Sequence, residues 1–246
     1  MLCYRAWIET RWRFLICLAV MLLPSVLLFH ELGLGLVSPN GTPLIASDPY
    51  FAYGLLFGTH LPAVRIWMCA AVFLGLGGLL RERAVGTSTL TLTLPVSRTH
   101  VIATRVGVGV GETIVLALAP WLANLFISLF CGGQFSYAQA GWCVLLLAGG
   151  GLVYFAGAVL ISSVVEGEYT AVAVIFALII GASYLAENVP GFRALDLYPL
   201  MSGTKFIDKG TSLFPGPMPW RSIFASLSVA ALMLLAAVGI TRRRDF

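Results

Sequence analysis

The chain has 246 residues, of which 59% are hydrophobic and 11% are charged, whereas soluble domains carry roughly 25% charged residues. Its mean hydropathy of +0.93 excludes a soluble globular fold, because so much apolar surface needs the hydrocarbon of a membrane around it. The net charge of +4 is spread along the chain in short groups, which argues against a nucleic-acid-binding patch. We therefore expect one transmembrane domain over residues 1–246, with no soluble second domain and no nucleic-acid partner.

Six stretches are long and apolar enough to cross a bilayer, which takes about twenty residues. The first follows a basic N-terminal segment and resembles a secretory signal, but no small-residue cleavage site follows it, so we expect an uncleaved span. The predicted fold class is an all-α membrane protein, a bundle of six transmembrane helices. The predicted spans are 14–36, 62–80, 106–130, 142–165, 169–186 and 222–240.

The fifteen lysine and arginine residues divide unequally between the two sides of the membrane. Ten fall on the side of the N-terminus, the 81–105 segment and the C-terminus, and five fall on the other side. Because basic residues accumulate on the cytoplasmic side, both termini are expected to be cytoplasmic and the protein to lie in the inner (plasma) membrane. Trp67, Trp142 and Trp220 then fall near the outer boundary, where interfacial aromatics are expected.

Two outer loops are long, at 37–61 and 187–221, and five prolines limit helix formation in the second one. The stretch 195–207 nevertheless mixes apolar and polar residues, as a segment does that lies in the interface or dips back into the membrane. Such a re-entrant or interfacial segment could cover the outer end of a pathway. An inert connector is the alternative.

Glycines recur in the third predicted span at Gly107, Gly109 and Gly111. A dinucleotide-binding fingerprint is excluded, because no strand precedes the run and Glu112 stands at the third glycine position. The spacing of Gly107 and Gly111 is GxxxG, which predicts close helix packing at these two positions.

Glu112 is the one ionisable residue firmly inside a predicted span. Embedded acids are costly and are often functional, so Glu112 is a candidate for a pathway or gating role. A structural pair with Arg105, or a side chain reaching the inner interface, is the alternative. Asn124 is the second candidate pathway residue.

The five cysteines are scattered, with no CxxC pair and no nearby histidine at metal-ligand spacing, so no metal site is predicted. Cys131 and Cys143 flank one outer loop and are either bridged or free. The chain also lacks a GxxxxGK[ST] phosphate loop and hydrolytic motifs such as HExxH and GxSxG. We expect no enzyme activity and no cofactor bound by this chain.

The inner loop between the second and third spans carries the most informative residues. Leucines at 90, 92 and 94 alternate with threonine, which locally suggests a strand. A lone strand at a membrane surface would leave its backbone unpaired, whereas a short interfacial helix would place Leu90 and Leu94 on one face. The helix is therefore preferred.

This loop resembles the cytoplasmic loop of ABC-2 type transporter permeases. The resemblance consists of Glu82, then Gly86-Thr87, a leucine-rich stretch, Leu94-Pro95-Val96-Ser97-Arg98 and the basic Arg105, and it extends to the closing Arg243-Arg244-Asp245-Phe246. It departs from the family pattern at Ser88 or Thr89, where Glu is common, and in its threonine-rich run.

The resemblance implies the permease subunit of an ATP-driven exporter, present as a homodimer or pseudo-dimer. Two copies of a separate ABC ATPase would bind ATP and magnesium, and the loop would form a short cytoplasmic coupling helix seated on them. A solvated loop with ordinary inner-side charges is the alternative. The implied coupling residues are Arg81, Glu82, Arg83, Gly86, Thr87, Leu90, Pro95 and Arg98.

Other functions stay open at this point. Within the superfamily, a haem-export or copper-site maturation permease is an alternative. Outside it, the chain could be a non-transporting assembly factor, or a membrane-embedded lipid enzyme, which should carry several acids or histidines at one depth. The transported substrate is not determined by these residues.

Overall fold

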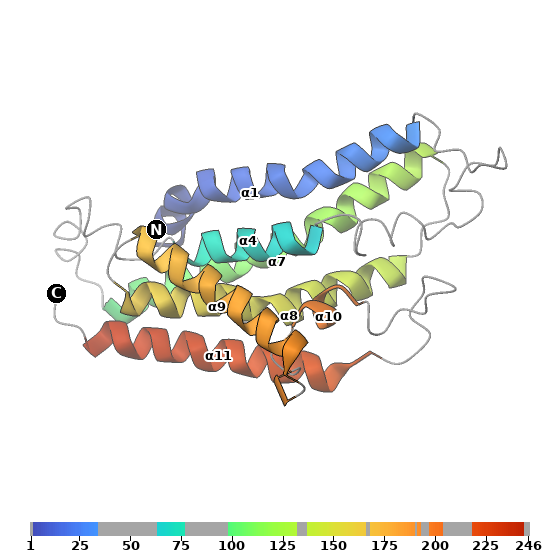
Figure 1. Cartoon of the computed structure of the whole chain (residues 1–246). Coiled ribbons are helices and arrows are strands. Elements are labelled where there is room, and N and C mark those ends of the chain that lie inside the picture. Colours follow the sequence, from blue (N-terminus) through green and yellow to red (C-terminus); the bar gives the residue numbers. More distant parts are fainter. Residues whose placement is uncertain are drawn as a thin grey trace.

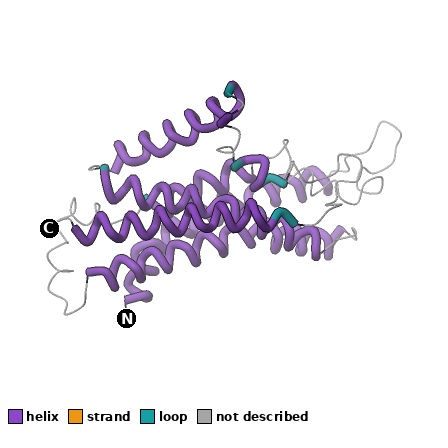
Figure 2. The backbone as a smooth tube through the Cα atoms, turned by 90° about the horizontal axis from the view of Figure 1, so that it is seen from below, coloured by secondary structure: helices purple, strands orange, loops and turns teal. Residues whose placement is uncertain are grey.

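The computed structural model describes residues 2–33, 63–76, 98–131, 137–165, 168–189, 191–192, 197–203 and 218–243. Within these ranges every regular element is a helix and no strand occurs (Figure 2). The helices are α1 (Leu2–Gly33), α4 (Ala63–Gly75), α7 (Arg98–Cys131), α8 (Tyr137–Val164), α9 (Glu168–Asn188), α10 (Tyr198–Met201) and α11 (Trp220–Arg243).

Four of these helices contain a stretch that is long and apolar enough to cross a membrane. These stretches are His100–Ala123, Gly141–Val164, Thr170–Asn188 and Trp220–Arg242. A shorter apolar stretch, Val64–Gly75, lies in α4. The chain is therefore an all-helical membrane protein. Each of the six predicted spans falls on one of the long helices or on α4, although the predicted spans 14–36 and 62–80 extend past the described residues.

Helix α8 lies at the centre of the bundle and contacts α4, α7, α9, α10 and α11 (Figure 1). Half of its apolar stretch is buried within the protein, against 17% for α9 at the edge. The sequence explains this difference, because glycines at 149, 150 and 151 leave room for neighbouring helices at the middle of α8. A Cβ atom on Gly149 would lie 2.8 Å from Ile223 of α11.

The space beside Gly151 of α8 is filled by a large aromatic ring. Trp67 of α4 is completely buried, and its ring occupies the space that a side chain on Gly151 would need. Trp67 is therefore an interior residue, and the prediction that it lies with the boundary aromatics is wrong for this residue. Trp142 and Trp220 do pair, with ring centroids 6.3 Å apart at the beginnings of α8 and α11.

Packing through Gly107 and Gly111 is not what the structure shows. Among the described residues, nothing lies within 4 Å of a Cβ placed on either of them. The close approach is made by Gly109, where a Cβ would lie 2.7 Å from the Phe155 ring of α8. The GxxxG spacing identified the right region, but Gly109 lies on the opposite side of α7 from Gly107 and Gly111, and it is the Gly109 side that faces α8.

The contacts fix the relative directions of the helices. Trp142 meets Trp220 and, further along, the hydroxyl of Ser226 donates to the carbonyl of Gly150 at 3.2 Å, so α8 and α11 run in the same direction. Helix α7 packs against α8 in the opposite direction, and the beginning of α1 lies at the same end of the bundle as the end of α11 (Figure 1).

The short helix α10 packs beside the middle of α8. Met201 is 1% exposed, and its Cγ atom lies 2.8 Å from where a Cβ on Gly150 would be. Gly150 is nine residues past Gly141, where the apolar stretch of α8 begins, which corresponds to a depth of about 14 Å at 1.5 Å per residue. Part of the 187–221 segment thus lies alongside the apolar interior of the bundle.

Cys143 is a buried free cysteine, so it forms no bridge to Cys131 in this structure. Within the described residues, no group of three or more His, Cys, Asp or Glu side chains could hold a metal ion.

Candidate functional site: the contact between α1 and α7

The predicted site residues fall into two groups in the structure. Those of the coupling loop lie outside the described residues, except for Arg98, which is the first residue of α7. Asn124 lies within α7, and the side chains of Arg98 and Asn124 are not among those described. Glu112 is described in full. The coupling-loop residues outside the described ranges are Arg81, Glu82, Arg83, Gly86, Thr87, Leu90 and Pro95.

Glu112 lies in the interface between α7 and α1 and is only 4% exposed. The hydroxyl of Thr10, on α1, donates a hydrogen bond to its Oε1 atom. Its Oε2 atom is buried and has no hydrogen-bond partner among the described residues. A buried carboxyl with a single partner is costly, and the bond to Thr10 offsets part of that cost across the two helices.

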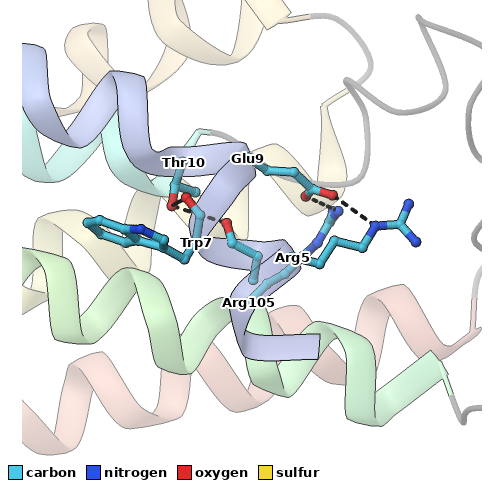
Figure 3. A network of polar contacts seen from close by, with 6 residues as sticks. Arg5, Trp7, Glu9, Thr10 and Arg105 are labelled. Carbon is cyan, nitrogen blue, oxygen red and sulfur yellow. Dashed lines mark hydrogen bonds and ion pairs between the residues drawn. The ribbon is translucent and has the colours of Figure 1, made fainter. Parts of the chain in front are cut away.

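A second polar contact joins the same helices at Arg105, about two turns before Glu112 on α7. Arg105 Nη2 donates to Glu9 Oε2 at 2.5 Å, and Arg5 Nε donates to Glu9 Oε1 at 3.3 Å (Figure 3). Glu9 therefore holds one arginine from α7 and one from its own helix. Arg105 and Glu112 thus have different hydrogen-bond partners on α1, and the pair between them was one of the alternatives that the sequence left open.

Sequence reasoning missed Glu9 and Thr10, because it placed them before the first span. The structure extends α1 back to Leu2, so both residues belong to the same continuous helix as the apolar residues that follow. One signal was present: Glu9 is the only acid among Arg5, Arg11 and Arg13, and it stands four residues from Arg5 and from Arg13.

The two polar contacts hold α1 against α7. The 34 residues of α7 span about 51 Å at 1.5 Å per residue, well beyond the roughly 30 Å of a hydrocarbon core. Its first residue, Arg98, precedes the apolar stretch His100–Ala123, and Arg105 lies within the first two turns of that stretch. A movement of the chain before Arg98 would reach α1 through the two contacts, because α7 is unbroken between them.

The fold and this contact define a helical membrane protein in which two long helices are tied together by polar contacts near one end of the bundle. No protein-family model matches the chain, and no curated protein sequence matches it.

Proposed function

We propose that the chain is the permease subunit of an ATP-driven exporter of the ABC-2 type, working as a homodimer or pseudo-dimer with two copies of a separate ABC ATPase. The proposal includes six membrane spans, with α1 and α4 as the first two, and cytoplasmic termini in the inner membrane. It is supported by the resemblance of the 82–105 segment to ABC-2 coupling loops and by the all-helical apolar bundle. The ATPase would supply the energy, and this chain the pathway.

The observation that carries the proposal is the position of α7. This helix begins at Arg98, directly after the coupling segment, and runs unbroken to Cys131. Helix α1 is bound to α7 by two contacts, one between Glu9 and Arg105 and one between Thr10 and Glu112. Closure of the ATPase pair would push on residues 82–98, and α7 would transmit that displacement to α1 as a rigid unit.

In this exporter, α10 would be part of the outer gate. Its packing against Gly150, deep within α8, supports a re-entrant segment that covers the outer end of a pathway. The buried side chains of Leu200 and Met201 anchor it there.

Coupling is tested by the double substitution Glu82→Ala with Thr87→Ala. We expect loss of ATPase association, or of ATPase stimulation by the permease, because the charge and the helix cap of the coupling segment are removed together. The measurement is ATPase co-purification and turnover in membranes that contain equal amounts of each permease.

The matched control is Glu187→Ala with Asn188→Ala, two exposed residues at the end of α9 that the proposed topology places on the outer side. This control should keep full coupling. Unchanged ATPase stimulation in the Glu82 and Thr87 variant would remove the exporter proposal.

Orientation is tested with Cys3, which is exposed near the beginning of α1. In a variant whose only cysteine is Cys3, a membrane-impermeant maleimide should label inverted vesicles and not intact cells, because the N-terminus is expected in the cytoplasm. A variant that keeps only the buried Cys143 should react from neither side. Labelling of Cys3 in intact cells would reverse the proposed topology.

A further inference from the structure

A depression opens at the basic end of the bundle, between the first turns of α1 and of α7. Its polar lining comes from two arginines, one glutamate and one threonine, and its apolar lining from three aliphatic side chains. We call it the headgroup groove; its lining residues are Leu2, Arg5, Ala6, Glu9, Val101, Thr104 and Arg105.

The lining of the groove is basic and presents hydrogen-bond donors. Two guanidinium groups and the carboxylate of Glu9 line the groove, so its lining has more basic than acidic groups. The Arg5 side chain is 44% exposed and bonds Glu9 through Nε, so its terminal amino groups point away from Glu9 (Figure 3). A guanidinium carries five donors in a planar fork that matches the oxygens of a phosphate.

The surrounding turns of α1 have the composition of a membrane interface. Tyr4 and Trp12 are 70% and 65% exposed, and Arg11 lies over the Trp12 ring at 5.6 Å. Tyrosine and tryptophan concentrate at the depth of lipid headgroups. A groove at this depth meets lipid phosphates directly, and its apolar members Leu2 and Val101 suit the glycerol and first methylenes of a lipid.

We propose that the headgroup groove binds the phosphate of an anionic phospholipid in the leaflet that faces the N-terminus. Basic recesses between transmembrane helices favour anionic lipids, and a zwitterionic headgroup would bring its cation towards Arg5 and Arg105. The bound phosphate would bridge α1 and α7 on the exposed side of the Glu9 ion pairs. This inference does not depend on the exporter proposal, because it uses only the described ends of these two helices.

The test measures lipid retained by the purified full-length protein. Protein in mixed micelles of phosphatidylglycerol and phosphatidylcholine is washed, and the bound lipid is quantified by mass spectrometry. We expect selective retention of phosphatidylglycerol, and a fall of about fivefold in Arg5→Gln, since one basic group near an anionic surface contributes that much. Arg221→Gln, at the opposite end of the bundle, is the control and should retain phosphatidylglycerol normally.

A second variant, Thr104→Glu, places a negative charge in the groove without removing either arginine. It should lose phosphatidylglycerol to a similar extent while its melting temperature in phosphatidylcholine micelles stays unchanged, which keeps the test valid if Arg5→Gln does not fold. Normal retention in a folded variant of either kind would overturn the proposal. Displacement of the lipid by inorganic phosphate alone would also overturn it, because the groove would then be a site for a soluble phosphate.

Discussion

Among the glycines of the described residues, Gly151→Ala is expected to destabilise the protein most. The new Cβ would lie 1.8 Å from Cζ3 and 2.4 Å from Cη2 of Trp67. This ring cannot move aside easily, since Trp67 is completely buried. Overpacking a tight core costs about 1 to 3 kcal/mol and occasionally more, and we expect about 3 kcal/mol here. The measurement is the thermal unfolding of purified protein in detergent, together with the yield of monodisperse protein.

Gly107→Ala is the matched control, since it adds the same methyl group to a helix position with open space around it. Its stability should be unchanged or raised by up to about 1 kcal/mol, the gain in helix propensity from glycine to alanine. Combining Gly151→Ala with Trp67→Leu should cost less than the sum of the two single changes, because the smaller side chain removes the overlap. Equal stability of the two alanine variants would show that α4 and α8 do not pack as described.

Thr10→Val is expected to lower the free energy of unfolding by about 2 kcal/mol. Valine keeps the shape of threonine but removes the hydroxyl that donates to Glu112, and a buried polar group that loses its partner costs about 1 to 3 kcal/mol. The same change should loosen α1 from α7. If the exporter proposal holds, it should also weaken the stimulation of the ATPase.

Thr113→Val provides the comparison within the same helix. The hydroxyl of Thr113 is also buried, but it donates to the carbonyl of Gly109 one turn earlier, so its loss leaves no carboxyl group without a partner. We expect a cost below about 1 kcal/mol. Adding Glu112→Leu to Thr10→Val should recover stability, since an apolar side chain needs no donor. Equal costs for the two valine variants, with no recovery in the double variant, would contradict the contact.

Much of the fold was predictable from the sequence. Runs of about twenty apolar residues can satisfy their backbone in a membrane only as helices, so the long helices could be located without knowing what they contact. The basic residues at the ends of these runs also predicted that the beginning of α1 and the end of α11 would share one side, and in the structure they lie at the same end of the bundle.

The partners of individual side chains could not be predicted in this way. Composition located Glu112 within a helix, but the rotation of α7 against α1 decided that its partner is Thr10 and that Arg105 goes to Glu9. The same rotation turns Gly109 towards Phe155 and leaves Gly107 open. Hydrophobicity alone does not specify these rotations, because a lipid-facing side and a buried side of a transmembrane helix are both apolar. The sequence by itself determined that the chain forms apolar helices and where along the chain they lie, and only the packing of the helices against one another decided which of their faces meet.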